Sequence, residues 1–184
     1  MTSDIIKTPT LTVARLHSQS PTRFELIPSA KAREQIATLL ELQALPKLRF
    51  AGAVSASGAD DWQLQGQLGA SVVQSCVLSL EPVRSRIDVP VTRLYLADFP
   101  ELGGEEEEIE MTIDENCEAL GSVIDLEAVM VEALSLALPL YPKAEGASLQ
   151  TTQSAPPGVT PLDDEATHPF AGLAALRDKM QGGE

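Results

Sequence analysis

The chain has 184 residues, of which 43% are hydrophobic and only 4% aromatic, so it can enclose one core, and that core is aliphatic. Thirteen basic and 27 acidic residues give a net charge of −14, which disfavours nucleic-acid binding by the chain as a whole and favours basic partners. No apolar run approaches the ~20 residues of a membrane span, the N-terminus lacks an apolar signal stretch, and two cysteines are too few for a disulfide scaffold. We therefore expect a cytoplasmic protein with no membrane partner.

Residues 1–22 are predicted to be an N-terminal segment with a short β-like alternation at Leu11 and Val13. A strand over residues 23–27 follows, with Phe24 and Leu26 on one face. Ser29 then has the position of a helix N-cap, and Pro46 stops the helix that it begins. The predicted buried face of this first helix consists of Ala32, Ile36, Leu39 and Leu40.

Three strands with alternating apolar and polar side chains come next. The first covers residues 47–55 and ends at a turn rich in Ser, Gly and Asp. The second runs from Trp62 to Val72, where Gly66 and Gly69 predict a bend or a bulge. These reversals predict an antiparallel β-meander.

The third strand begins near Val83 and can continue to Leu96. Pro90 lies within it and marks either an edge strand or a change of phase. Residues 98–121 are predicted to be an acidic connection that contains Cys117 and at most a short strand at residues 109–113. Glu105, Glu106, Glu107 and Glu108 form its densest run of charge, which favours contact with a basic partner; the alternatives are a simple solvated loop and, less favoured, a cation site.

The most apolar helix of the chain is predicted to start at Asp125, a residue suited to N-capping, and to stop at Pro139. Val131 and Leu136 add apolar surface outside its main stripe, so more than half of the circumference is expected to be covered. The stripe itself follows helical spacing and consists of Leu126, Val129, Met130, Ala133, Leu134, Ala137 and Leu138.

These elements predict an α+β fold in which an antiparallel meander carries two main helices on its apolar face, with a partly closed barrel as the alternative if the N-terminal strand joins the edge. The domain is expected to span residues 23–142. Residues 143–167 have the composition of a flexible linker, and residues 168–184 are expected to hold a short C-terminal helix.

The polar face of the meander carries the candidate site. Lys47 and Arg49 share a face of the first strand, and Arg84 and Arg86 share a face of the third. Three glutamines, Gln63, Gln65 and Gln67, line the strand between them. This arrangement can contact phosphates, and without aromatic side chains it cannot read bases. The alternative is an ordinary solvated sheet face.

No pattern of residues indicates catalysis. The chain has no Gly-rich phosphate loop, no HExxH and no GxSxG, and its two histidines lie in predicted loops. Cys76 has no second cysteine at short spacing and is expected to be a small buried side chain. We therefore expect neither an enzyme nor a bound metal or cofactor.

Three stretches together resemble the YceD family, the large ribosomal RNA subunit accumulation proteins: SCVLSLEPVRSRIDVPVTRLYLADFPE, GSVIDLEAVMVEALSLALPLYP and the tail HPFAGLAALRDKM. The resemblance covers roughly residues 24–180. Its most specific parts are Ile124, Asp125 and Leu126 at the start of the helix, Leu138 and Pro139 at its end, and Pro169 and Phe170 in the tail. Many members have Cys-x-x-Cys at the turn matching Cys76; here Ser79 takes the second place, which argues against a metal site.

The resemblance implies a non-enzymatic role in the accumulation or processing of large-subunit (23S) rRNA. The implied partners are this rRNA or a pre-ribosomal particle, and a basic ribosomal protein of the large subunit. The alternative is an acidic, holdase-like module that binds a basic protein without RNA contact. An RNA-processing enzyme is a third and weaker hypothesis, because no acid, base and metal ligands are brought together by the sequence.

Overall fold

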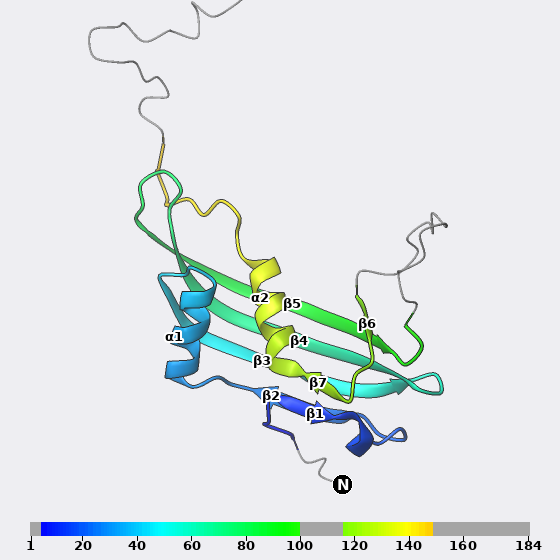
Figure 1. The fold of residues 1–184 in the computed structure, drawn as a ribbon. Helices are drawn as coiled ribbons and strands as arrows, with labels where there is room; N and C mark the ends of the chain where they lie inside the picture. The colour runs from blue at the N-terminus through cyan, green and yellow to red at the C-terminus, as the bar shows by residue number, and fades with distance from the viewer. Residues whose placement is uncertain (1–4, 100–115, 149–184) are drawn as a thin grey trace, which may run out of the picture. The chain divides into compact units, whose positions relative to one another are not determined.

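The computed structural model of the protein describes residues 5–99 and 116–148 (Figure 1). The chain divides into two units, residues 1–145 and 146–184, and every element described below belongs to the first. Over these described residues the fold is mixed α+β, with an open five-stranded sheet of order β2-β3-β4-β5-β6 and two α-helices. The predicted short strand at 109–113, the linker beyond residue 148 and the C-terminal helix lie outside the described residues.

Three long antiparallel strands form the centre of the sheet, as the alternation predicts. They are β3 (Ala44–Ser57), β4 (Asp61–Ser75) and β5 (Pro82–Leu96). At one edge, β2 (Thr22–Leu26) pairs antiparallel with β3; at the other, β6 (Cys117–Ala119) pairs parallel with the end of β5. The connection expected over residues 98–121 therefore contains a strand. In the described residues β2 and β6 are the two outer strands and do not pair, so the sheet is open. Ile6 of the N-terminal segment makes an isolated parallel bridge to Phe24 at the β2 edge, and the barrel alternative is not confirmed.

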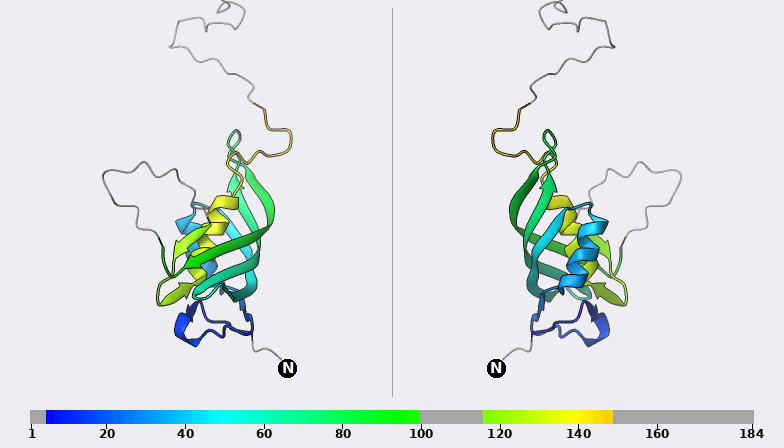
Figure 2. Two further views of the ribbon diagram at one scale, coloured as in Figure 1. Left: turned by 90° about the vertical axis from the view of Figure 1, so that its right-hand side faces the viewer. Right: turned by 90° about the vertical axis from the view of Figure 1, so that its left-hand side faces the viewer.

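Both helices lie on the same, concave face of the sheet (Figures 1 and 2). Helix α1 (Ala30–Leu39) packs on β3, and its N-cap is Ser29, whose hydroxyl accepts from the Ala32 N–H. Its buried residues are Ile36 and Ala37. The prediction that Leu39 is buried was wrong: its side chain is 70% exposed. Compared with the predicted face, the buried face of α1 is rotated about the helix axis, so that Ala37 faces the core in place of Leu39.

Helix α2 (Leu126–Ala137) contacts β4 and β5, and Asp125 is its N-cap as predicted. One Asp125 carboxylate oxygen accepts from the N–H groups of Glu127 and Ala128, both at 3.0 Å. The apolar stripe faces the core, whereas Leu136 is 76% exposed. The prediction that more than half of the circumference of this helix is covered was therefore wrong. The sheet covers one side of this helix, and no second layer of described residues lies over the other.

The N-terminal segment closes the end of the sheet near α2. Strand β1 (Thr10–Thr12) pairs with β7 (Val123–Asp125), which leads directly into α2, and a short 3-10 turn (Val13–Arg15) follows β1. Leu11 and Ile124 lie opposite each other in this ribbon and are both buried. The start of α2 is thereby attached to the N-terminal residues.

Gly52 of β3 and Gly66 of β4 allow these two strands to pack closely. Of the bend or bulge predicted at Gly66 and Gly69, the bulge is not found. The register of β4 is continuous through Gly66 and Gly69, and the irregularity lies in β3 between Ala44 and Lys47. A Cβ at Gly52 would come within 2.2 Å of the Gln65 carbonyl oxygen, and one at Gly66 within 2.7 Å of the Phe50 ring. The missing side chains therefore serve a close approach between strands.

Pro90 lies on a strand edge, one of the two readings that the sequence left open. The Leu94 N–H donates to the Asn116 carbonyl, so N–H groups of even-numbered β5 residues point away from β4. Strand β6 pairs only with Leu94–Leu96, so no strand lies beside Pro90 on that side of β5. The missing N–H of Pro90 therefore costs the sheet no hydrogen bond. No helix among the described residues is long and apolar enough to cross a membrane.

Candidate functional site: a basic sheet face

The register of the meander brings the predicted cationic residues onto one face. Lys47 lies opposite Ser71, and Ser71 lies opposite Arg86, so these three form one row across the sheet. Arg49, Gly69 and Asp88 form the next row, and Arg84 lies beside the first, opposite Val73. Directly opposed residues share a face, so Lys47, Arg49, Arg84 and Arg86 all project from the side without helices. We call this surface the basic panel.

Two of the four panel cations are paired with carboxylates. Arg49 Nε donates to Glu25 Oε1 at 2.8 Å, from the neighbouring strand β2. Arg86 holds Asp88 through two bonds of 2.7 Å, from Nε and Nη2. The hydrogen bond from Arg86 lowers the pKa of Asp88 and, reciprocally, raises that of Arg86. Lys47 and Arg84 make no ion pair with the described residues.

A cavity of about 330 Å³ opens into the panel where β2 ends. Strand β2 pairs with β3 only from Phe50 to Val54, so the β3 edge at Lys47 and Leu48 is not covered by it. Arg33 of α1 reaches this edge: its Nε donates to the Leu45 carbonyl at 3.1 Å and its Nη1 to the Pro28 carbonyl at 2.8 Å. The charged residues lining the cavity are Arg33, Lys47, Arg49, Arg86 and Asp88.

Sequence reasoning missed Arg33. Its place on a helix gave no signal, because its contact with the panel depends on where α1 lies against β3. The predicted position of the glutamines is confirmed. Gln63, Gln65 and Gln67 lie on β4 opposite residues of β3 that face the side without helices, and Gln67 lines the cavity. The surface is therefore a cation-rich hollow continued by an amide-bearing stretch of sheet.

The family model described as large ribosomal RNA subunit accumulation protein YceD matches residues 64–177, more than half of the chain. The chain belongs to the YceD family. Comparisons with curated proteins and with solved structures find no match.

The residues at the start and end of α2 that carry the resemblance to the family bound this helix. Ile124 and Leu126 are almost completely buried, and Asp125 between them caps the helix. At the other end Leu138 is the C-cap, and the Pro139 carbonyl accepts from Gln74 Nε2 at 3.2 Å. The tail residues Pro169 and Phe170, and the acidic run Glu105, Glu106, Glu107 and Glu108, lie outside the described residues.

The turn that begins at Cys76 meets the segment that follows α2. The Val77 N–H donates to the Pro142 carbonyl at 2.9 Å. The buried Cys76 sulfur accepts from the N–H groups of Leu78 and Ser79, both at 3.4 Å, and of Ala144 at 3.3 Å. These donors lower the pKa of the Cys76 thiol to about 6, with Ala144 the largest cause, while desolvation acts in the opposite direction.

The Cys76 sulfur thus accepts from backbone N–H groups of both segments, and the side chain of Ser79 also lowers the pKa of its thiol. Cys117, the other cysteine, lies in β6 and is partly buried. Within residues 5–99 and 116–148, no three His, Cys, Asp or Glu side chains converge as a metal ion would require. In this YceD chain, hydrogen bonds from residues 78, 79 and 144 join the two segments.

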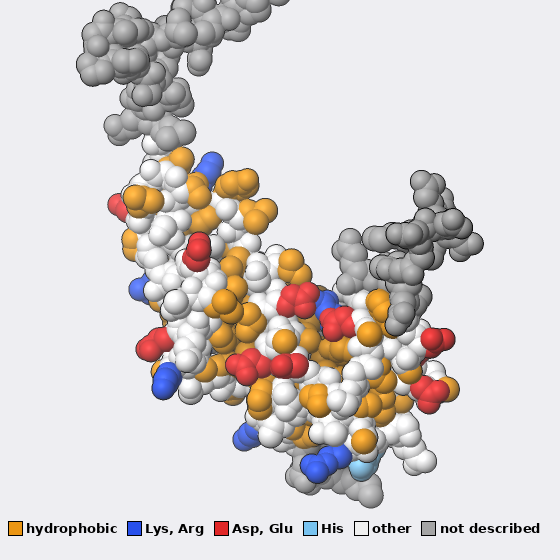
Figure 3. Space-filling model, viewed as in Figure 1, with side chains coloured by type: hydrophobic (Ala, Val, Ile, Leu, Met, Phe, Trp, Pro, Cys, Tyr) orange, Lys and Arg blue, Asp and Glu red, His pale blue; other side chains and the backbone are white. Residues whose placement is uncertain are grey.

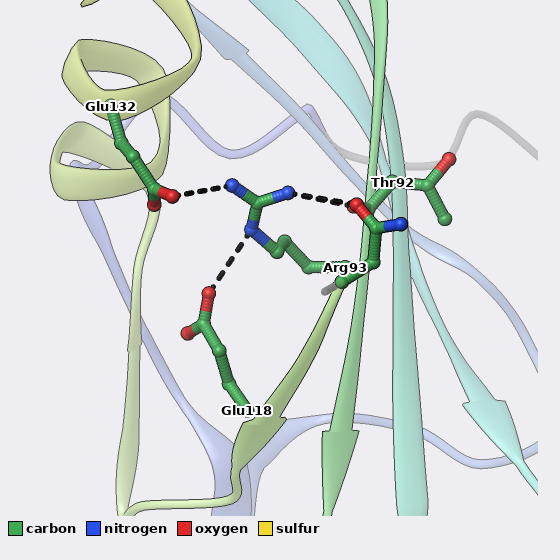
Figure 4. A network of polar contacts seen from close by, with 5 residues as sticks. Thr92, Arg93, Glu118 and Glu132 are labelled. Atoms are coloured by element: carbon green, nitrogen blue, oxygen red, sulfur yellow. Dashed lines mark hydrogen bonds and ion pairs between the residues drawn. The ribbon is translucent and has the colours of Figure 1, made fainter. Parts of the chain in front are cut away.

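Arg93 forms a buried polar cluster that sequence reasoning also missed. The residue is 7% exposed and lies on the helix-bearing face, opposite Leu64. Its guanidinium bonds Glu132 of α2 at 2.7 Å, Glu118 of β6 at 3.1 Å, the Asn116 side chain and the Thr92 carbonyl (Figure 4). A signal was present: Ile87, Val89 and Val91 place position 93 on the apolar face, where a charge requires a partner.

Proposed function

We propose that this protein is a non-enzymatic ribosome-biogenesis factor that supports accumulation and processing of the large-subunit (23S) rRNA. Membership of the YceD family supports a role in large-subunit rRNA accumulation. The finer proposal, direct contact with rRNA phosphates through the basic panel, rests on one observation: four cations from two non-adjacent strands share the sheet face without helices.

The panel has the chemistry of a backbone-binding surface. Its arginines and lysine suit phosphate oxygens, its glutamines offer further donors, and the face between its strands carries no aromatic ring for base stacking. Contact with phosphates fixes position without reading sequence. We therefore expect binding to a pre-ribosomal particle that owes little to base identity.

The acidic residues suggest a second partner. The helix-bearing face carries acidic side chains over its middle (Figure 3). Helix α2 contributes Glu127 and Glu132, and β6 contributes Glu118. With the acidic run near residue 106, they favour a basic protein, such as a ribosomal protein of the large subunit. The proposal therefore has two surfaces of opposite sign, one for rRNA and one for a protein.

The first test is depletion followed by complementation. Depletion is expected to lower 23S rRNA relative to small-subunit rRNA, and an unchanged ratio would contradict the proposed role. Complementation then uses Lys47→Glu with Arg84→Glu, the two panel cations without ion pairs, so that folding is not expected to suffer.

The matched control reverses Arg15 and Lys31, two exposed cations outside the panel. It carries the same change of net charge. We expect association with pre-ribosomal particles to fall in the panel variant and to persist in the control. Equal association of both would favour the holdase-like alternative, in which a basic protein is bound without RNA contact.

A further inference from the structure

The cavity at the end of β2 differs from the rest of the basic panel. Four cations and one carboxylate line it, a net charge of about +3 in a chain whose total is −14. The charged residues come from three elements, α1, β3 and β5, and β4 supplies the uncharged Gln67 and Gly69. Cations from several elements facing one hollow raise the local concentration of anions and favour anion binding.

Arg33 is held in position before any ligand arrives. Two backbone carbonyls, of Pro28 and Leu45, accept from its Nη1 and Nε. These bonds fix the plane of the guanidinium and leave the other N–H donors for a ligand. A donor that is already ordered loses less entropy on binding than a free surface arginine.

The carboxylates order the other two arginines. Glu25 takes only Nε of Arg49, so both terminal nitrogens of Arg49 stay available. Asp88 takes two nitrogens of Arg86 and lines the cavity itself. Asp88 therefore occupies donors that an incoming anion would use, and its carboxylate competes with that anion.

Gly69 keeps the floor of the cavity open. A Cβ there would stand 3.0 Å from both Arg86 Nη2 and Asp88 Oδ1. The Arg86–Asp88 pair thus lies directly over the glycine, and Lys47 and Arg49 flank it from β3. Ile27 and Pro46 also line the hollow and offer apolar surface to a sugar or a base.

We infer that this cavity binds a terminal phosphate of an RNA strand, with Arg33, Lys47 and Arg49 as donors. A phosphomonoester carries a charge of about −1.5 to −2 at pH 7 and three strong acceptor oxygens, which matches a hollow with several converging cations better than a singly charged phosphodiester does. The inference rests on the proposed function, since it assigns the end of the strand whose backbone follows the panel. The adjoining glutamine rows, Gln67 to Gln63, extend from the cavity along the same face.

The test compares oligoribonucleotides of one sequence that differ only at an end: 5′-phosphate, 3′-phosphate or hydroxyl at both ends. Affinity is measured with the full chain by fluorescence anisotropy, with the label on the other end. We expect one terminal phosphate to bind about tenfold more tightly than the hydroxyl form. Equal affinity for all ends would overturn the terminal-phosphate site and leave the panel contact standing, whereas no binding of any form would overturn both.

Two variants with opposite signs guard against misfolding. Lys47→Met is expected to remove most of the preference for the phosphorylated end, and Asp88→Asn, which deletes the competing carboxylate, is expected to strengthen binding of that end about threefold. Misfolding cannot produce a gain. Asp88→Asn binding that is unchanged or weaker would contradict the role given to the cavity.

Matched controls change the same charges elsewhere. Lys31 is two residues from Arg33, on another side of α1, and Asp60 is exposed in the β3–β4 turn. Lys31→Met and Asp60→Asn are expected to keep the wild-type preference. Inorganic phosphate serves as the competitor: displacement of the RNA only at much higher concentration supports an RNA end, whereas displacement at equal concentration would identify free phosphate and overturn the RNA source.

Discussion

Cys76 shows how one side chain is adapted to its turn. Its sulfur lies where the β4–β5 connection meets residues 142–144, and backbone N–H groups from both segments point at it. A thiolate accepts such bonds more strongly than a thiol, so the ionised form favours the folded chain. The pKa in the folded state, about 6, is below the ordinary value of 9.0.

The sign of the pH dependence follows from this lowered pKa. The stabilisation from Cys76 is complete above about pH 9, shrinks as the pH falls, and is absent below about pH 6. We expect the difference in unfolding free energy between wild type and Cys76→Ser to be larger at pH 9 than at pH 6, measured by urea denaturation. Cys117→Ser is the control, and a pH-independent difference for Cys76→Ser would refute the thiolate.

Single side chains also decide which panel residues are suited to charge reversal: Lys47 and Arg84 are better choices than Arg49 and Arg86. The latter are 57% and 54% exposed in their side chains and are held by Glu25 and Asp88. Reversing either would place two acids together. Reversing an unpaired cation changes the surface charge and breaks no described ion pair.

At the scale of elements, Arg93 joins three parts of the fold. It lies on β5, and its two carboxylate partners lie on β6 and α2. The guanidinium is buried, whereas the side chains of Glu118 and Glu132 are 42% and 51% exposed. Since the carboxylates keep contact with water, most of the desolvation cost falls on Arg93.

This asymmetry predicts an order of stabilities. Replacing both carboxylates, Glu118→Gln with Glu132→Gln, leaves a buried cation without an ionised partner and is expected to cost about 2–3 kcal/mol. Arg93→Met removes the buried charge as well and is expected to cost only about 1 kcal/mol, because the methionine fills part of the same space. Urea denaturation of the purified variants measures both losses of unfolding free energy. The reverse order would contradict the assignment of most of the desolvation cost to Arg93.

At the scale of the whole molecule, the charge is unevenly distributed. The helix-bearing face shows acidic side chains around α2 (Figure 3), and the opposite face of the sheet carries the basic panel. The total of −14 means that the folded chain repels itself. Added salt screens both this repulsion and any attraction between the panel and phosphates.

The two effects of salt have opposite signs. Between low salt and about 0.3 M NaCl we expect the unfolding temperature to rise, by calorimetry, because self-repulsion is screened. Over the same range RNA binding is expected to weaken, with a slope of about −2 to −3 in log association constant against log salt for three or four phosphates. Lys47→Met should make that slope shallower, and binding that does not respond to salt would exclude the panel as a phosphate surface.

The local sequence was sufficient for the long elements. Alternation from Leu48 to Val91 identified β3, β4 and β5, and the Asp125 cap with Pro139 bounded α2, because period and capping depend on neighbouring residues. It also placed the four panel cations on one face, because short turns make consecutive strands antiparallel. It failed for Leu39, Leu136 and the glycines, where burial depends on what packs opposite.

By itself, then, the sequence determined the meander, the two helices, the face to which each strand residue belongs and the family. Only the tertiary structure decided that β2 stops short on β3, that Arg33 reaches the uncovered edge, and that Arg93 meets Glu118 and Glu132. Which side of a strand a residue faces follows from its neighbours in the chain. Which charges converge depends on the register, length and placement of elements far apart in sequence, and these are set by the packing of the whole core.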